Sequence, residues 1–102
     1  MPSLDDLRRQ AAQRLIVGYD EPAQLDAWDA HPPGGLIFFR QNLQGYGPNS
    51  LADLRAWLAA LSRRFEADGL APLLGIDQEG GYVERLPHTL FPALLAPWAV
   101  AK

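Results

Sequence analysis

The sequence contains no cysteine, no apolar run long enough to cross a membrane and no extended basic segment. The absence of cysteine excludes disulfide bonds, zinc sites with thiolate ligands and cysteine nucleophiles. A net charge of -3, with no basic run longer than a pair such as Arg63-Arg64, argues against a nucleic-acid-binding surface. The first 14 residues lack the continuous apolar core of a signal peptide. We therefore expect a cytoplasmic protein that binds neither nucleic acid nor membranes.

Residues that could hold a metal or a phosphate group are also scarce. The two histidines, His31 and His88, are isolated, and no second ligand is spaced for a metal. The glycine pair Gly80-Gly81 is followed neither by Lys-Ser/Thr nor by glycines at dinucleotide-binding spacing. We therefore expect no metal and no cofactor, and we attribute the glycine pair to a tight turn or a close backbone approach.

The composition is that of one folded domain. Of the 102 residues, 48% are hydrophobic and 21% are charged, which is ordinary for a globular protein and argues against disorder. Segments with helical spacing alternate with short apolar runs that predict strands. Helices are expected at residues 3–12, 22–30 and 50–65, and strands at residues 15–19, 36–39 and 73–76. Helical crossovers between buried strands imply an α/β protein with about three parallel strands.

Two of the predicted helices begin with capping signals. Ser3 precedes Asp5 and Asp6, and acids in a first helical turn are favoured by the helix dipole. Ser50 precedes Asp53 at capping-box spacing, with aspartate in place of the usual glutamate. Both helices are therefore expected to start at these serines.

Polar residues cluster where two of the predicted strands end. The segment Asp77-Gln78-Glu79-Gly80-Gly81 follows residues 73–76, and Arg40-Gln41-Asn42 follows residues 36–39. In parallel sheets the residues beyond the carboxyl ends of the strands commonly bind ligands. The two clusters would share one rim, although a polar turn that ends the strand is the favoured interpretation of Arg40, Gln41 and Asn42.

Two motifs resemble the N-terminal part of family 3 glycoside hydrolases. They are residues 34–42, Gly-Gly-Leu-Ile-Phe-Phe-Arg-Gln-Asn, and residues 75–86, Gly-Ile-Asp-Gln-Glu-Gly-Gly-Tyr-Val-Glu-Arg-Leu, with a leucine-rich helix between them. The most similar branch is that of the bacterial β-N-acetylhexosaminidases (β-N-acetylglucosaminidases), and the resemblance covers roughly residues 4–98. It implies a TIM (β/α)8-type barrel and retaining hydrolysis of terminal β-linked N-acetylhexosamine in carbohydrate metabolism. Because a complete barrel needs about 250 residues, residues 1–102 would be a single N-terminal segment of the barrel domain.

The resemblance assigns roles to two residues, because it implies that Asp77 and Arg85 bind the sugar. The residues themselves place Glu79 behind Asp77, where it could pair with Arg85. An ion pair of Arg85 with Glu79 or Glu84 is the structural alternative to a sugar-binding role of Arg85. Tyr82 stands where the family commonly has arginine. The family's catalytic aspartate and the histidine-containing acid/base loop lie farther along the chain and have no counterpart here, and His88 does not match that loop. No catalytic residue is therefore assigned, and these residues alone are expected to be inactive.

Asp77 and Glu79 could in principle be the two carboxyl groups of a retaining glycosidase, which lie about 5 to 5.5 Å apart. Alternate residues along one strand are separated by a similar distance. Both groups would approach the sugar from one side, whereas the mechanism needs them on opposite sides. Hydrogen bonding to sugar hydroxyls is the favoured role of Asp77, and capping of the loop is the alternative.

Other functions remain open. The main alternative is a non-catalytic sugar-binding or interaction module that takes up an N-acetylglucosamine-containing sugar without hydrolysing it. A small flavodoxin-like domain is disfavoured because acids at the strand ends repel an anionic ligand. Unpaired strand edges and uncovered apolar faces are expected to make the chain either marginally stable or self-associating. The tryptophans, Trp28, Trp57 and Trp98, are attributed to the core rather than to sugar stacking.

Overall fold

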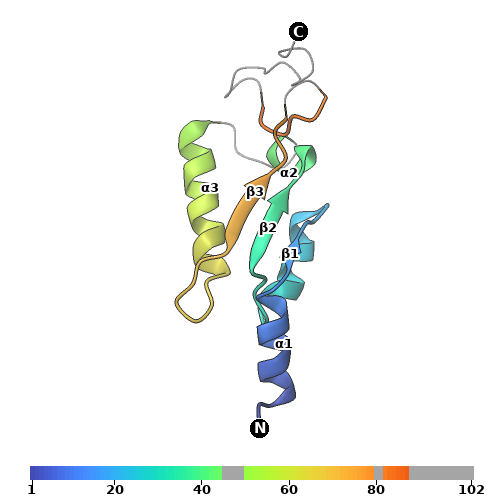
Figure 1. Cartoon of the computed structure of the whole chain (residues 1–102). Helices are drawn as coiled ribbons and strands as arrows, with labels where there is room; N and C mark the ends of the chain where they lie inside the picture. Colours follow the sequence, from blue (N-terminus) through green and yellow to red (C-terminus); the bar gives the residue numbers. More distant parts are fainter. Residues whose placement is uncertain (45–49, 80–81, 88–102) are drawn as a thin grey trace.

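The computed structural model describes residues 1–44, 50–79 and 82–87. Along the chain its elements are α1 (Leu4–Ala12), β1 (Ile16–Val17), the 3-10 helix η1 (Pro22–Trp28), β2 (Gly35–Phe38), α2 (Arg40–Gln44), α3 (Leu51–Arg64) and β3 (Leu73–Ile76). This alternation confirms the predicted mixed α/β class (Figure 1). The glycine pair and residues 88–102, with His88 and Trp98, lie outside the described residues.

The three strands form one parallel sheet in the order β1-β2-β3. β2 pairs with β3 over four residues, from Gly35 opposite Leu73 to Phe38 opposite Ile76. β1 pairs with β2 through two residues only, Ile16 and Val17. Because all strands run the same way, their carboxyl ends meet at one edge, which is the upper edge in Figure 1.

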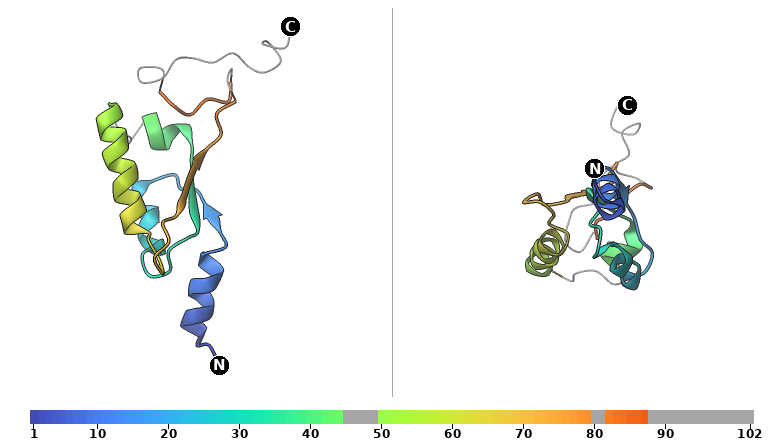
Figure 2. Two further views of the ribbon diagram at one scale, coloured as in Figure 1. Left: turned by 60° about the vertical axis from the view of Figure 1, so that its left-hand side comes forward. Right: turned by 90° about the horizontal axis from the view of Figure 1, so that it is seen from below.

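The helices η1, α2 and α3 lie on the same face of the sheet (Figure 2). Between this layer and the sheet lies a core whose centre is fully buried, as Leu36 at 0% exposure and Phe65 at 1% show. The buried members of this core are Tyr19, Leu25, Leu36, Phe38, Leu43, Leu61 and Phe65. Side chains alternate between the two faces of a strand, which accounts for the burial of Leu36 and Phe38 on the helix-covered face.

No described helix covers the other face of the sheet (Figure 2). Its apolar residues are open to solvent, with Ile16 at 62% and Leu73 at 70% exposure. Gly75, two residues beyond Leu73, is also exposed, and nothing lies within 4 Å of a Cβ built on it. We call Ile16, Leu73 and Gly75 the open face of the sheet.

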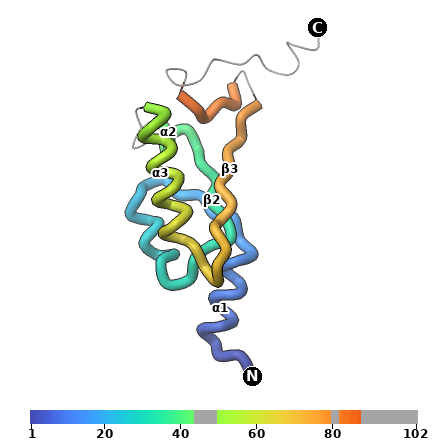
Figure 3. Tube along the Cα trace, turned by 90° about the vertical axis from the view of Figure 1, so that its left-hand side faces the viewer, coloured from blue at the N-terminus to red at the C-terminus, as the bar shows by residue number. Residues whose placement is uncertain are grey.

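Helix α1 extends away from the carboxyl edge of the sheet (Figure 3). Its start confirms the capping prediction, because the Ser3 hydroxyl accepts a hydrogen bond from the Asp6 amide at 3.1 Å and the Asp6 carboxylate accepts one from the Ser3 amide at 3.2 Å. The same interaction starts α3, where the Ser50 hydroxyl accepts from the Asp53 amide at 3.0 Å. Local hydrogen bonds therefore set both starts.

The end of α1 packs closely against the chain that leads into β2. The Gly34 amide donates to the Ala12 carbonyl at 3.0 Å, and the Gln13 side-chain amide donates to the Pro32 carbonyl at 2.8 Å. A Cβ built on Gly34 would lie 2.1 Å from the Gln13 carbonyl oxygen. Glycine is therefore required at this position because two backbone segments touch there.

Two predictions of local structure need correction. β1 spans two residues, although an apolar run of five predicted a longer strand, because only Ile16 and Val17 find partners in the sheet. Arg40, Gln41 and Asn42, interpreted as a polar turn, instead form the first turn of α2. Within the described ranges, no helix combines the length and the apolar character needed to cross a membrane.

Candidate functional site

Three polar segments meet at the carboxyl edge of the sheet. Residues 18–20 follow β1, residues 39–41 follow β2 and residues 77–79 follow β3. Since the strands are parallel and neighbours in the sheet, these segments lie side by side. The sequence predicted the second and third of them at this rim, and the first was missed.

Asp77 is an exposed residue one position beyond the end of β3. In the alternation of β3 it follows Leu73 and Gly75, which are exposed, rather than Leu74 and Ile76, which contact the core. Phe38 pairs with Ile76. The residues that follow them, Phe39 and Asp77, therefore lie at neighbouring positions. Asp77 therefore lies at the predicted edge, continuing the open face of the sheet.

Phe39 occupies the middle of this edge. A Cβ on Gly18 would lie 2.7 Å from Cε2 of the Phe39 ring, so the glycine leaves the room that this ring occupies. The Arg85 guanidinium carbon lies 5.9 Å from the centre of the same ring, within the range of a cation–π contact. The predicted sugar-binding arginine is thus brought back to the strand ends, next to an aromatic ring.

The loop after β3 is closed by its own hydrogen bonds. The Gln78 side-chain oxygen accepts from the amides of Arg85 at 2.8 Å and Leu86 at 3.3 Å. The Glu79 amide donates to the Val83 carbonyl at 2.8 Å. Gln78 had no predicted role, yet it joins the two ends of the loop. Glu79 is exposed and takes part through its backbone, and the ion pair expected for its carboxylate stays a prediction.

Arg40 connects the end of β2 to this loop. Its Nε and Nη2 atoms donate to the Glu84 carbonyl oxygen at 3.3 and 3.0 Å. Glu84 is only 3% exposed, so this carbonyl is held away from bulk water. Arg40 therefore positions the loop that carries Arg85. Local sequence patterns do not reveal this role, because Arg40 and Glu84 lie 44 positions apart.

Asn42 joins the ends of β1 and β2. It is 2% exposed, its Oδ1 accepts from the Phe39 amide at 2.7 Å, and its Nδ2 donates to the Tyr19 carbonyl at 3.0 Å. Both functional ends of the side-chain amide are thus used, one at the start of α2 and one in the segment after β1. This buried amide fixes the spacing of the two segments.

An open pocket of about 320 Å3 lies at this edge, between residues 18–20, residues 39–41 and Arg85. It is lined by Asp20, Phe39, Arg40, Gln41 and Arg85. Across it, Gln41 Nε2 donates to Asp20 Oδ1 at 3.4 Å. We call this the edge pocket. Of the predicted sugar-binding residues, Arg85 lines it, whereas Asp77 lies on the same edge outside its lining. Asp20 was missed, although an acid directly after an apolar run was a usable signal.

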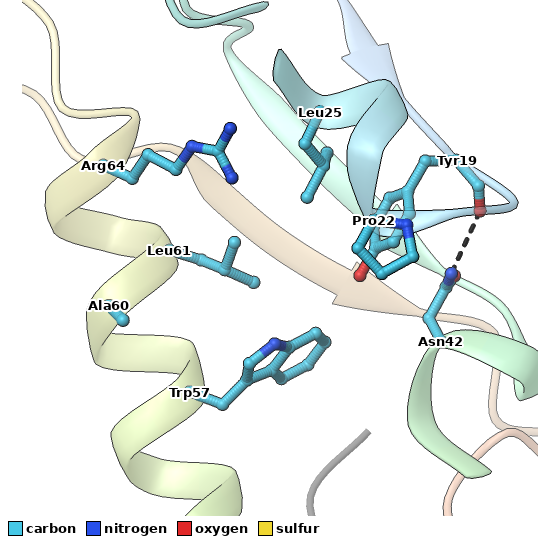
Figure 4. Close-up of a pocket in the computed structure, with 8 residues that line it drawn as sticks. All are labelled: Tyr19, Pro22, Leu25, Asn42, Trp57, Ala60, Leu61 and Arg64. Carbon is cyan, nitrogen blue, oxygen red and sulfur yellow. Dashed lines mark hydrogen bonds between the residues drawn. The ribbon is translucent and has the colours of Figure 1, made fainter. Parts of the chain in front are cut away.

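A second pocket, of about 240 Å3, lies between η1 and α3 (Figure 4). Its lining is largely apolar, with Trp57 and Leu61 on one side and Pro22 and Leu25 on the other. Trp57 packs on Phe38 with ring centres 4.9 Å apart. This tryptophan therefore contacts the core, as predicted, and the pocket belongs to the packing between the two helices.

Arg64, which lines this second pocket, forms two ion pairs. Arg64 donates through Nε to Asp29 at 2.7 Å and through Nη2 to Asp26 at 2.8 Å. Hydrogen bonding to Arg64 lowers the pKa of Asp29, and the same contact raises the pKa of Arg64. At the other side, burial raises the pKa of the Tyr19 hydroxyl. The ion pairs of Arg64 tie α3 to η1 and to Asp29 at its end.

Comparisons with models of protein families, with curated proteins and with solved structures found no match to this chain. Functional interpretation therefore rests on the residues and their geometry. In the part of the chain that the structure describes, no group of three or more histidine, aspartate or glutamate side chains is placed to hold a metal ion.

The edge pocket offers both hydrogen-bond acceptors and hydrogen-bond donors. Asp20 brings a carboxylate, Gln41 an amide, and Arg40 and Arg85 bring guanidinium groups, around the ring of Phe39. Pockets of about 300–1,000 Å3 with a few convergent polar groups are typical of small-molecule sites. Such a set suits a ligand that carries several hydroxyl or amide groups on a compact ring.

Proposed function

We propose that this chain is a family 3 glycoside hydrolase-like protein of the β-N-acetylhexosaminidase type, and that these residues supply part of its sugar-binding site. The observation that carries the proposal is the location of Asp77 and Arg85. Both belong to the motif of residues 75–86, and both lie at the edge where three parallel strands end. Ligand sites of α/β proteins occur at this edge.

The proposed roles follow from the chemistry of each group. Asp77, exposed beyond β3, accepts hydrogen bonds from two sugar hydroxyls, which charged acceptors bind strongly. Arg85 donates to a ring substituent such as the acetamido carbonyl, while its chain position is held by Gln78. Glu79 supports the loop.

We further propose that the sheet is part of a (β/α)8-type barrel. Three features support this: consecutive parallel strands in sequence order, helices on one face, and an apolar open face. In such barrels the inner face is filled by branched apolar side chains from several strands. Ile16 and Leu73 would be contributed to that interior.

Hydrolysis with retention needs a carboxylate nucleophile and an acid/base group, and neither is assigned within these 102 residues. We therefore expect sugar binding without turnover. Calorimetric titration of the chain with N-acetylglucosamine should give measurable heat, and Asp77→Asn should weaken binding about tenfold, because a charged acceptor is lost. A chromogenic aryl N-acetylglucosaminide should not be hydrolysed.

Asp68→Asn is the matched control. Asp68 is exposed, lies in the turn before β3, at the far end of that strand from Asp77, and has a φ of 52° that asparagine tolerates. It should bind as the unmodified chain does. Absence of heat with the unmodified chain would refute the proposed sugar site, as would an affinity of Asp77→Asn equal to that of the unmodified chain. If the unmodified chain hydrolysed the aryl substrate and Asp77→Ala did not, the expectation that these residues are inactive would be wrong.

A second candidate function, an interaction module, is favoured by the open face. Ile16 and Leu73 are more than half exposed, and β1 and β3 are edge strands. We propose that the chain associates with itself through these surfaces. Sedimentation at several concentrations should show a concentration-dependent increase in mass, and a monomer at all concentrations would contradict it. A cytoplasmic location is also proposed, and cell fractionation tests it.

A further inference from the structure

We infer that Asp20 and Gln41 form a second hydrogen-bonding wall for the sugar, in the edge pocket between the ends of β1 and β2. This inference rests on the proposed function and extends it. Asp77 and Arg85 come from the loop after β3, whereas Asp20 and Gln41 come from the two other strand ends. The sugar would thus be held by all three segments rather than by one.

Asp20 is held in place by its backbone. Its amide donates to the Gln24 side-chain oxygen at 2.7 Å, and the same oxygen accepts from the Glu21 amide at 3.2 Å. These bonds join Asp20 to the first turn of η1. Its carboxylate is therefore presented from a fixed backbone, which lowers the entropy lost when a ligand binds.

The contact between Asp20 and Gln41 uses only part of the hydrogen-bonding capacity of the two side chains. It is a single long hydrogen bond, 3.4 Å from Nε2 to Oδ1, and both residues are exposed. A carboxylate accepts about four hydrogen bonds and a side-chain amide makes about four. A sugar with neighbouring hydroxyls can therefore donate to Asp20 and pair with Gln41 without breaking buried contacts.

The Asp20 carboxylate favours a neutral polyhydroxylated ligand over a phosphate, against the attraction of the two guanidinium groups for an anion. Arg40 and Arg85 are positive, but the Asp20 carboxylate faces the same pocket, and Arg40 already donates through two nitrogens to the Glu84 carbonyl. A phosphate placed here would meet a carboxylate, which is unfavourable at short range. A sugar can use the carboxylate as an acceptor and the guanidinium groups as donors.

Calorimetric titration with N-acetylglucosamine tests this wall with three variants. Asp20→Asn should weaken binding about tenfold, since a charged acceptor becomes neutral, and Gln41→Ala should weaken it roughly fivefold. Asp68→Asn is again the control and should bind normally. Thermal melting of each variant shows that it is folded.

Amide NMR spectra of the unmodified chain give a second reading that needs no variant. N-acetylglucosamine should shift the amides of residues 18–20 and 39–41 as well as those of residues 77–79. Inorganic phosphate at equal concentration should leave them in place.

The outcomes separate this inference from the proposed function. Sugar binding with normal affinity for Asp20→Asn, or shifts confined to residues 77–86, would overturn the second wall and leave the proposed function standing. Phosphate shifts at residues 18–20 without sugar shifts would overturn it in favour of an anion site. No sugar binding at all would overturn both.

Discussion

Asn42 offers the sharpest test of how the candidate site is held together. Replacement by alanine removes the donor to the Tyr19 carbonyl, a buried bond, and the acceptor for the Phe39 amide, a part-buried bond. A buried polar group left without a partner costs about 1–3 kcal/mol, and the loss of a typical hydrogen bond costs about 0.5–1.5 kcal/mol. We expect Asn42→Ala to lower the free energy of unfolding by about 1.5–4.5 kcal/mol.

Small domains have unfolding free energies of about 5–15 kcal/mol, so this loss is large. Urea denaturation followed by circular dichroism measures it directly. At roughly 4–8 °C per kcal/mol for a domain of this size, the melting temperature should fall by about 6 °C or more. Gln10→Ala is the matched control, because Gln10 is an exposed amide on α1, and its effect should stay within about 0.5 kcal/mol.

The result also bears on the sugar. Because Asn42 connects the segments that carry Asp20 and Arg40, the variant should lose sugar affinity even at a temperature where it is folded. A stability loss under about 1 kcal/mol, equal to that of Gln10→Ala, would refute the reasoning. It would show that water replaces both hydrogen bonds and that α2 does not depend on this side chain.

Two further predictions concern stability. Gly34→Ala should destabilise the fold by about 1–3 kcal/mol, because its Cβ would lie 2.1 Å from the Gln13 carbonyl oxygen. Gly75→Ala is the control and should be neutral or slightly stabilising, because nothing lies within 4 Å of its Cβ. Equal urea midpoints for the two variants would contradict this prediction. Hydrogen bonding to Arg64 lowers the pKa of Asp29 below its ordinary 3.8, so the stability that Asp29 contributes is full above pH 3.8 and is lost as the pH falls through the lowered pKa. The melting temperature, measured from pH 2 to pH 6, should therefore fall at the acidic end of this range. If Asp29→Asn showed the same dependence of melting temperature on pH as the unmodified chain, the prediction would be wrong.

The elements that sequence patterns predicted well are those with local causes. Ser3 and Ser50 each bond to an amide three residues ahead, so a short stretch of sequence contains the whole interaction. The third strand was placed at the correct residues because its apolar run ends directly at Asp77. In each case cause and effect lie within one turn or one strand.

The details that sequence patterns missed depend on distant partners. Arg40 bonds to a residue 44 positions away, and Asn42 to one 23 positions away. A five-residue helix such as α2 has little intrinsic stability. Its start is held by Asn42, whose side-chain oxygen accepts a hydrogen bond from the Phe39 amide. The sequence places Asp20 after an apolar run, but its position beside Gln41 depends on the pairing of the short strand β1 with β2.

The open face and the carboxyl edge of the sheet belong to the same strands, and under the proposed function this has a thermodynamic consequence. Asp77 continues the line of Leu73 and Gly75 along β3. Any partner that packs on that line would restrict the motion of the strand that ends at Asp77, and a sugar bound to Asp77 would restrict the same strand from its other end. The two binding events must then be reciprocally coupled. The factor by which the partner changes the affinity for sugar equals the factor by which sugar changes the affinity for the partner.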